Sequence, residues 1–404
     1  MSARRLGTAT LLCLLAAAWV ACDSNPVGPV PGHELGIVWL FNSNHFAALD
    51  LQENAIVWQS DSIMHFIASA VFSPDGETVY GSGSAARYQG GWKNSELWAL
   101  DAHTLHILWR LAVTDSAGFR RDRFGGLGIH AWLGDGMAIS PDGRRLFIMP
   151  ADDGDPNAGT GIAVFDVGSR TVAGFIGPFA GGTGALATVP PGAYRPDGAI
   201  AFSPHPSSDW PGLSWKIWLV DPTTLAVTDS VDLSAEATGS ADGIGVMRSA
   251  PDGDALYVRT AAGMFLKYDL LAHQVTARVQ EPAASRMAIS PDGRRIYTPL
   301  PWSIDGPSPG VIHVYDADLN RLPSIDLSHL NGWSETLPPA LDAAAVERDG
   351  TLLVSAGANS VELWGSQAGR IFVIDPATDT VEKTIPVPEA PPEIIMLPEL
   401  SPVY

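Results

Sequence analysis

Seven short apolar segments of this chain each end in an aspartate that a turn follows at once. They read AALD, WALD, AVFD, WLVD, LKYD, HVYD and FVID, and their aspartates lie 47 to 65 residues apart: Asp50, Asp101, Asp166, Asp221, Asp269, Asp316 and Asp375. A second motif, an apolar run closed by a turn, precedes every copy but the first: VFSPDGETVY, AISPDGRRLF, AFSPHP, RSAPDGDALY, AISPDGRRIY and VERDGTLLV. A fixed pair of motifs at a period near 50 residues predicts a repeat architecture.

Each repeat divides into four short strands. In the unit at 284–327 the strands are predicted at Arg286–Ser290, Arg295–Pro299, Val311–Tyr315 and Leu322–Leu327. Four-stranded units repeated around a ring are the blades of a β-propeller. The first unit, Gly36–Ser60, lacks an innermost strand, and Pro392–Pro398 offers one. We therefore predict an all-β fold, a seven-bladed β-propeller of four-stranded antiparallel blades, in which the C-terminal strand pairs into the first blade and closes the ring.

The two motifs resemble the YVTN-type propeller repeats. The resemblance lies in Ser-Pro-Asp-Gly before a strand with Tyr or Phe, and in the apolar-Asp turn of the Pro-Ala-Thr-Asp-Thr-Val kind. Lactonase-type and amine-dehydrogenase-type propellers share this pattern, which covers nearly all of the chain after the amino-terminal segment. The shared residues form turns and strands, so the resemblance implies the fold more than the function. The fourth unit departs after Ser203-Pro204, where HPSSDWPG predicts an irregular second strand.

The amino terminus resembles a bacterial lipoprotein signal. Arg4 and Arg5 precede an apolar stretch that ends at Ala21-Cys22, although Trp19 stands where an aliphatic residue is usual. Cleavage after Ala18, which would release a soluble secreted protein, and an uncleaved anchor are the alternatives. The predicted organisation is a signal peptide at 1–21, a Pro/Gly-rich tether at 22–34, the propeller at 35–398 and a tail at 399–404. We expect an exported cell-envelope protein that meets the membrane only through lipid on Cys22.

Composition excludes several classes of function. The formal net charge of −20 repels polyanions, so nucleic acid is not an expected partner. The two cysteines, Cys13 and Cys22, both belong to the signal region. The propeller itself therefore has no disulfide, thiol nucleophile, Cys-ligated metal or covalent haem site. No Gly-x-Ser-x-Gly elbow or phosphate loop is present. We expect a monomer.

The insertions between strands are predicted to share one face. If the strands alternate in direction, the first and third turns of each blade lie on one face, and the long second loops and inter-blade connections lie on the other. Variable loops on a rigid scaffold commonly carry binding sites. Aromatic side chains suit carbohydrate, peptide or protein ligands, and the candidates are Tyr88, Trp92, Trp132, Tyr194, Trp302, Trp333 and Trp364. Packing of the long loops onto the ring is the alternative.

Polar residues precede several inner strands and are predicted to ring the channel mouth: His65, Asp135, Asp197, Asp242, Arg286, Asp342 and Glu393. Such an acidic ring suits Ca²⁺, and Arg286 suits an anionic substrate oxygen. Ordinary strand ends facing solvent are the alternative. A second calcium candidate is Asp153, Asp155 and Asn157, which resembles an EF-hand opening but has its Gly one place late and lacks Glu at the twelfth position.

Two main functions follow. The first is a non-catalytic, lipid-anchored module that binds an envelope protein, peptide or carbohydrate and carries no cofactor. The alternative is a lactonase-like or metal-assisted hydrolase at the channel mouth, with His65, Asp135, Arg286 and Asp342 as base and charge-stabilising candidates. A quinoprotein or haem-d1-like dehydrogenase is a third hypothesis.

Overall fold

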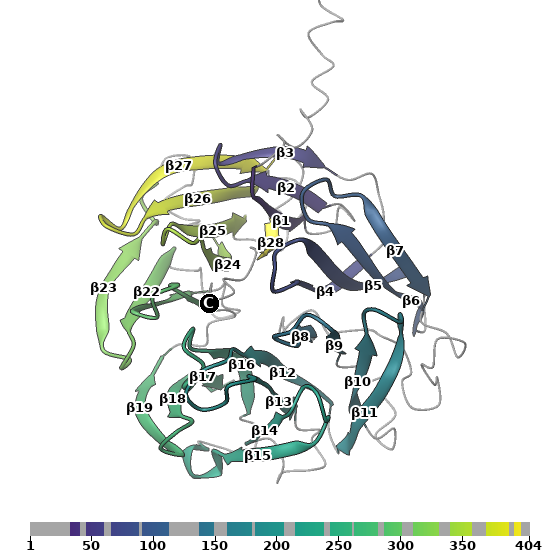
Figure 1. Cartoon of the computed structure of the whole chain (residues 1–404). Coiled ribbons are helices and arrows are strands. Elements are labelled where there is room, and N and C mark those ends of the chain that lie inside the picture. Colours follow the sequence, from purple (N-terminus) through teal and green to yellow (C-terminus); the bar gives the residue numbers. More distant parts are fainter. Residues whose placement is uncertain are drawn as a thin grey trace, which may run out of the picture.

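The chain forms seven β-sheets arranged around a ring (Figure 1). The computed structural model describes residues 33–40, 46–59, 66–88, 91–112, 137–148, 160–179, 182–205, 215–237, 243–260, 262–281, 287–300, 310–330, 340–357, 369–387 and 392–396. Each sheet has four antiparallel strands. The protein is therefore a seven-bladed β-propeller, as the repeat predicted.

We number the blades along the chain and name the strands of each blade A to D from the centre of the ring outward. Blade 1 consists of β28 (Pro392–Met396), β1 (Leu35–Leu40), β2 (Phe46–Asp50) and β3 (Ala55–Gln59), and blade 2 of β4 (Phe66–Phe72), β5 (Thr78–Tyr88), β6 (Gly91–Asp101) and β7 (Ile107–Ala112). Blade 3 consists of β8 (Met137–Ile139), β9 (Arg145–Ile148), β10 (Thr160–Asp166) and β11 (Thr171–Phe179). Blade 4 consists of β12 (Gly182–Val189), β13 (Ala199–His205), β14 (Lys216–Val220) and β15 (Val227–Asp232).

Blade 5 consists of β16 (Ile244–Ser249), β17 (Ala255–Thr260), β18 (Met264–Asp269) and β19 (Gln274–Gln280). Blade 6 consists of β20 (Ala288–Ile289), β21 (Arg295–Pro299), β22 (Val311–Asp316) and β23 (Arg321–Asp326). Blade 7 consists of β24 (Ala340–Val346), β25 (Leu352–Gly357), β26 (Gly369–Asp375) and β27 (Thr380–Val387). A short 3₁₀ helix, η2, spans Ser234–Glu236. Within the described ranges, no helix has the length and apolar character needed to cross a membrane.

The ring is closed by a strand from each end of the chain. β28 is the inner strand of blade 1 and pairs antiparallel with β1, with Val38 opposite Ile395 and Trp39 opposite Ile394. The predicted closure is therefore confirmed. It removes an open sheet edge that would otherwise present unpaired backbone groups.

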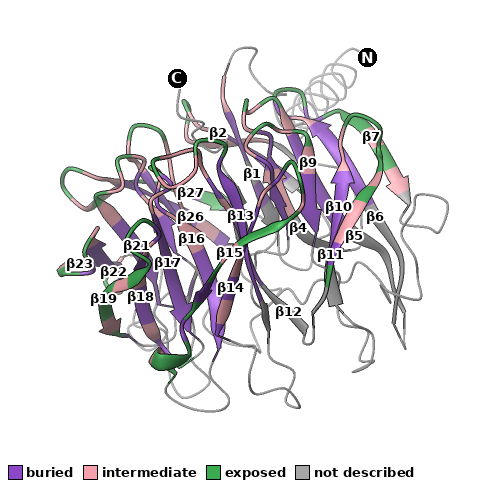
Figure 2. Ribbon diagram, turned by 60° about the horizontal axis from the view of Figure 1, so that its bottom comes forward, coloured by how far each residue is buried: buried purple, intermediate pink, exposed green. Residues whose placement is uncertain are grey.

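The apolar core lies between the blades. The described residues form seven buried apolar clusters, and each joins two neighbouring blades around the ring. Middle strands are buried on both faces, as in β17, where all six residues are buried. Outer strands such as β19 alternate between exposed and half-buried residues, and Figure 2 shows this exposure on the outer strands and the turns. Each blade thus depends on its two neighbours for burial.

The fourth blade corrects the sequence-based prediction. The AFSPHP motif is predicted to end an inner strand, but its first residues belong to strand B, β13. The inner strand is the preceding run β12, and a longer turn at 190–198 brings Pro196-Asp197-Gly198 directly before β13. The irregular strand B predicted after Ser203-Pro204 falls on HPSSDWPG, whose residues from 206 onward lie outside the described ranges; the strand B that the structure describes is β13, in which Ile200 and Phe202 pair with both β12 and β14. The small side chains of β12 fit the crowded centre of the ring, and this run therefore forms the inner strand.

Candidate functional site

The A–B and C–D turns form one face of the ring, which we call the turn face. Each C–D turn begins with one of the seven repeated aspartates, whose carboxylate accepts backbone N–H groups of the turn. Asp221 Oδ1 accepts the amides of Thr223 and Thr224 at 2.8 Å each, and these bonds, with that of Thr224 foremost, hold the pKa of Asp221 below its ordinary value. Among described non-glycine residues, positive φ occurs at the end of these turns: Asn54, Leu105, Arg170, Leu225, His273, Leu319 and Asp379. The repeated aspartates are therefore structural.

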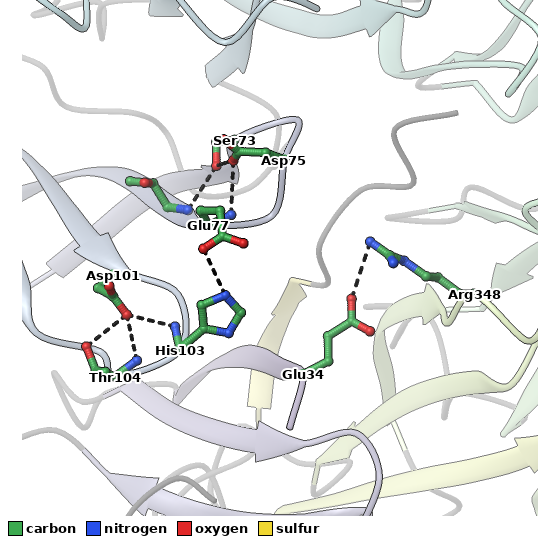
Figure 3. Close-up of polar contacts among 9 residues, drawn as sticks. Glu34, Ser73, Asp75, Glu77, Asp101, His103, Thr104 and Arg348 are labelled. Carbon is green, nitrogen blue, oxygen red and sulfur yellow. Dashed lines mark hydrogen bonds and ion pairs between the residues drawn. The ribbon is translucent and has the colours of Figure 1, made fainter. Parts of the chain in front are cut away.

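The A–B turns interlock around the centre of the same face. In blade 2 the Ser73 hydroxyl donates to Asp75 Oδ1 at 2.5 Å, and Asp75 Oδ1 also accepts the Glu77 amide at 3.0 Å (Figure 3). Turns of neighbouring blades touch: a Cβ on Gly143 would lie 3.3 Å from a side-chain atom of Pro74, which belongs to the preceding blade. These turns are five residues long in blades 2, 3, 5, 6 and 7 and longer in blade 4, and blade 1 has none because its inner two strands come from the two ends of the chain.

Arginine and lysine side chains also connect neighbouring blades on the turn face. Arg145 Nη1 donates to the carbonyl of Pro222 in the next blade at 2.7 Å, and Lys383 Nζ donates to the carbonyl of Glu53 across the closure at 2.6 Å. Arg295 Nη1 pairs with Asp379 at 2.6 Å. The polar groups of the turn face are thus largely engaged within the ring.

The opposite ends of the strands define the loop face, from which the B–C loops and D–A connections leave the blades. The longest strands, β5 and β6, meet there as a hairpin, and each has 11 residues. Their pairing continues to the tip, where Arg87 lies opposite Trp92 and Tyr88 lies opposite Gly91. The predicted ligand-binding residues Tyr88 and Trp92 therefore belong to strands rather than to a B–C loop, and they occupy neighbouring but unpaired register positions at the end of this strand pair.

Two candidates of the channel mouth lie at the loop-face ends of inner strands. Asp342 is the third residue of β24, at an irregularity in its pairing with β25. Glu393 is the second residue of β28, which lies beside β24. The backbone thus brings these two acidic positions to adjacent inner strands.

The remaining candidates lie outside the described residues: His65, Asp135, Asp242, Arg286, Trp132, Trp302, Trp333, Trp364, Asp153, Asp155, Asn157 and Cys22. Their predicted roles stay predictions. Among the residues that are described, no group of three or more His, Cys, Asp or Glu side chains is placed to hold a metal ion.

Tyr194 and Asp197 are on the other face from the one predicted. Both lie in the A–B turn of blade 4, because the strands of that blade are shifted by one relative to the prediction. The Tyr194 ring packs against the apolar cluster between blades 4 and 5, and its hydroxyl donates to Asp229 Oδ2 at 2.9 Å. Burial and this acceptor raise the pKa of Tyr194. Asp197 is exposed on the turn face.

A buried polar cluster between blades 5 and 6 has no counterpart in the predictions. Glu281, at the end of β19, lies 2.5 Å from His313 Nδ1 and accepts a bond from Arg321 Nη1 at 3.0 Å. Arg259 is 1% exposed, and its guanidinium lies 5.3 Å from the centroid of the Phe265 ring. Glu281 and His313 are 32 residues apart, so only the docking of adjacent blades brings them together.

The charges of this cluster follow from its surroundings. Burial pushes the pKa of Glu281 upward, but the nearby Tyr315 hydroxyl, the bond from His313 and the charge of Arg321 outweigh burial, so the pKa lies below its ordinary value. Burial lowers the pKa of His313 despite the nearby carboxylate. Burial also lowers the pKa of Arg259 to about 10, and this residue stays a cation at neutral pH. An ionised Glu281 and a neutral His313 therefore share the site.

Among the comparisons with known proteins, the one with solved structures supports the fold. No protein-family model matches the chain, and no curated protein matches it. Among solved structures 1433 chains match, so the architecture is widely shared. One of them is dihydro-heme d1 dehydrogenase NirN in complex with DHE, with a TM-score of 0.54, 17% identity, and coverage of 92% of this chain and 77% of that chain. At this identity the likeness shows the fold alone, and its chemistry does not transfer.

Proposed function

We propose that the protein is a binding module that holds a ligand or partner on its loop face. The observation that carries this proposal is the β5–β6 hairpin. Its two strands are longer than strands B and C of the other blades, and its tip contains Tyr88 and Trp92. The turn face supports it by contrast, because its aspartates, serines and bridging cations are engaged in contacts within the ring.

The ligand class follows from the two residues at the hairpin tip. Tyr and Trp combine a broad apolar ring with a hydrogen-bonding group, and they dominate binding energy where they line contact surfaces. A carbohydrate or an extended peptide of the cell envelope fits such a tip. The acidic character of the chain disfavours polyanionic ligands.

The test is a comparison of two sets of surface variants. Tyr88→Ser and Trp92→Ser alter the hairpin tip, and Leu271→Ser, at a residue 53% exposed in a C–D turn, is the matched control on the turn face. Binding to arrayed envelope glycans and peptides is measured, followed by titration calorimetry for each positive. We expect each tip variant to weaken binding at least about tenfold, or about 1.4 kcal/mol, and the control to leave it unchanged. No binding by the parent chain, or equal losses on both faces, would contradict the proposal.

We further propose that Cys22 is lipidated and tethers the propeller to a membrane, on the strength of the signal pattern at residues 1–22. Metabolic labelling with a fatty-acid analogue is the measurement. Cys22→Ser should abolish the label and release the protein from the membrane fraction, and Cys13→Ser should do neither. Label retained in the Cys22 variant would refute the anchor.

A further inference from the structure

The A–B turn of blade 7 has a carboxyl group at a position where three other blades have a serine. In those blades the hydroxyls of Ser73, Ser140 and Ser290 each donate to the aspartate two residues later, at 2.5, 2.5 and 2.7 Å. In blade 7 the corresponding residues are Glu347 and Asp349. A hydroxyl always has a proton to donate, whereas a carboxyl has one only when it is protonated.

The rest of the blade 7 turn keeps the pattern of the serine turns. Asp349 Oδ1 accepts the amide of Thr351 at 2.9 Å, and Gly350 N donates to the Glu347 carbonyl at 3.0 Å. Glu347 follows directly on the inner strand β24. Its Oε1 is buried and has no hydrogen-bond partner among the residues that the structure describes. A buried oxygen in this state is costly unless the carboxyl group is protonated and bonded.

This turn lies at the seam where the ring closes. Glu34, directly before β1 of blade 1, is near enough to raise the pKa of Glu347, and it pairs with Arg348 at 3.6 Å (Figure 3). Arg348 is 55% exposed, so solvent screens its charge. Three carboxyl groups, those of Glu34, Glu347 and Asp349, therefore meet at one seam.

Other described cations on the two sides of blade 7 have partners of their own, and across the closure Lys383 Nζ donates to the carbonyl of Glu53 at 2.6 Å. On the blade 1 side, His33 Nδ1 lies 2.7 Å from Asp50 Oδ2. On the blade 6 side, Arg295 pairs with Asp379. Neither pair supplies a cation to Glu347.

We propose that Glu347 is a proton-operated latch of ring closure. When protonated, its carboxyl group donates a hydrogen bond to Asp349, as the serine hydroxyl does in blades 2, 3 and 6, and the seam between blades 7 and 1 is tight. When the proton is lost to solvent, Glu347, Asp349 and Glu34 carry like charges in a partly buried space, and the seam loosens. The affected elements are β24, β28 and β1, which together close the ring.

The titration falls in the neutral range. Burial, with the charges of Asp349 and Glu34, raises the pKa of Glu347 from 4.5 to about 7. Because the pKa is higher in the folded chain than in the unfolded chain, the contribution of Glu347 to stability is complete in acid and is lost as the pH rises from about 4.5 to about 7. The full-length chain should therefore close more firmly at pH 5 than at pH 8, once other titrating groups are subtracted.

The test uses two variants and a control. Glu347→Gln supplies a permanent amide donor, and Glu347→Ser restores the turn of the other blades. Glu382→Gln changes an exposed glutamate on β27 of the same blade. The unfolding equilibrium is measured in urea at pH 5 to 8, and hydrogen–deuterium exchange, corrected for intrinsic rates, follows β1 and β28.

We expect the unfolding constant of the parent chain to rise at least about tenfold relative to both Glu347 variants between pH 5 and pH 8, since each pKa unit of difference corresponds to a factor of ten. Exchange in β1 and β28 should accelerate at pH 8 in the parent and the control, but not in the variants. An unchanged pH profile in Glu347→Gln or Glu347→Ser would overturn the latch. Exchange that changes only within residues 347–351 would show a local titration without control of closure.

Discussion

Replacing Glu281 with alanine should test whether the cluster between blades 5 and 6 stabilises the ring. The substitution removes the acceptor of His313 at 2.5 Å and of Arg321 at 3.0 Å. It also removes the carboxylate whose charge favours the cation of Arg259. Removing one member of a buried group of charges typically lowers the free energy of unfolding by about 3–5 kcal/mol, because the opposite charge stays buried.

The two sides of the cluster should contribute unequally. The Arg321 side chain is 45% exposed, so its pair with Glu281 is screened and is worth about 1 kcal/mol or less. The side chains of His313 and Glu281 are 10% and 3% exposed. We therefore assign most of the expected loss to the buried side of the cluster.

Urea unfolding at pH 7.5 of Glu281→Ala, Glu281→Gln and Arg321→Ala measures these terms. Glu281→Ala should lower the free energy of unfolding by about 3–5 kcal/mol, Glu281→Gln by less because the amide oxygen still accepts a bond, and Arg321→Ala by about 1 kcal/mol at most. Equal small losses for Glu281→Ala and Arg321→Ala would refute the reasoning, because the buried contacts would then carry no stability.

Three further outcomes are expected. Because burial lowers the pKa of His313 from 6.5, its contribution to stability is lost as the pH falls below about 6.5. Urea titrations at pH 5, 6 and 7 should therefore show a smaller loss of stability on acidification in His313→Gln than in the parent chain. An equal loss in the two proteins would contradict this. Gly253→Ala, with φ of 72° and its Cβ 2.3 Å from a backbone carbonyl oxygen of blade 4, should cost about 1–3 kcal/mol, whereas Gly168→Ala, with its nearest atom at 3.6 Å, should be neutral in the same assay. Deleting 392–404 should lower the calorimetric midpoint and broaden the transition, because β28 is lost; deleting 399–404 should do neither, and similar curves would count against closure by β28.

Local turn chemistry made the propeller predictable. An aspartate after a strand accepts the amides of its own turn, and a glycine in Pro-Asp-Gly tolerates positive φ, as Gly76, Gly143, Gly253 and Gly293 do. Both signals depend on neighbouring residues and are therefore visible in the chain. The fourth blade differs from the prediction because its Pro-Asp-Gly stands at 196–198, at the end of a longer turn, and because β12 and β13 are similar apolar runs that both suit the inner position.

The site was less predictable. Tyr88 and Trp92 are predicted as aromatic residues of a long B–C loop, whereas the structure extends β5 and β6 through both positions; their role in binding stays a prediction. The Glu281 cluster was missed because its members come from strands of two blades and carry no local pattern. Glu347 did have a signal, a carboxylate in place of serine in an aligned turn, but its consequence depends on Glu34 across the seam.

The sequence alone determined the number of blades and the C–D turn of each blade, since backbone hydrogen bonding and turn conformation act over a few residues. The pairing of the two ends could be predicted because the first unit lacks an inner strand. Tertiary structure alone decided which polar groups are buried and therefore which titrate in the neutral range. Those properties arise in the seams, where each blade supplies half of the surroundings, and desolvation and charge act between residues that the chain order keeps apart.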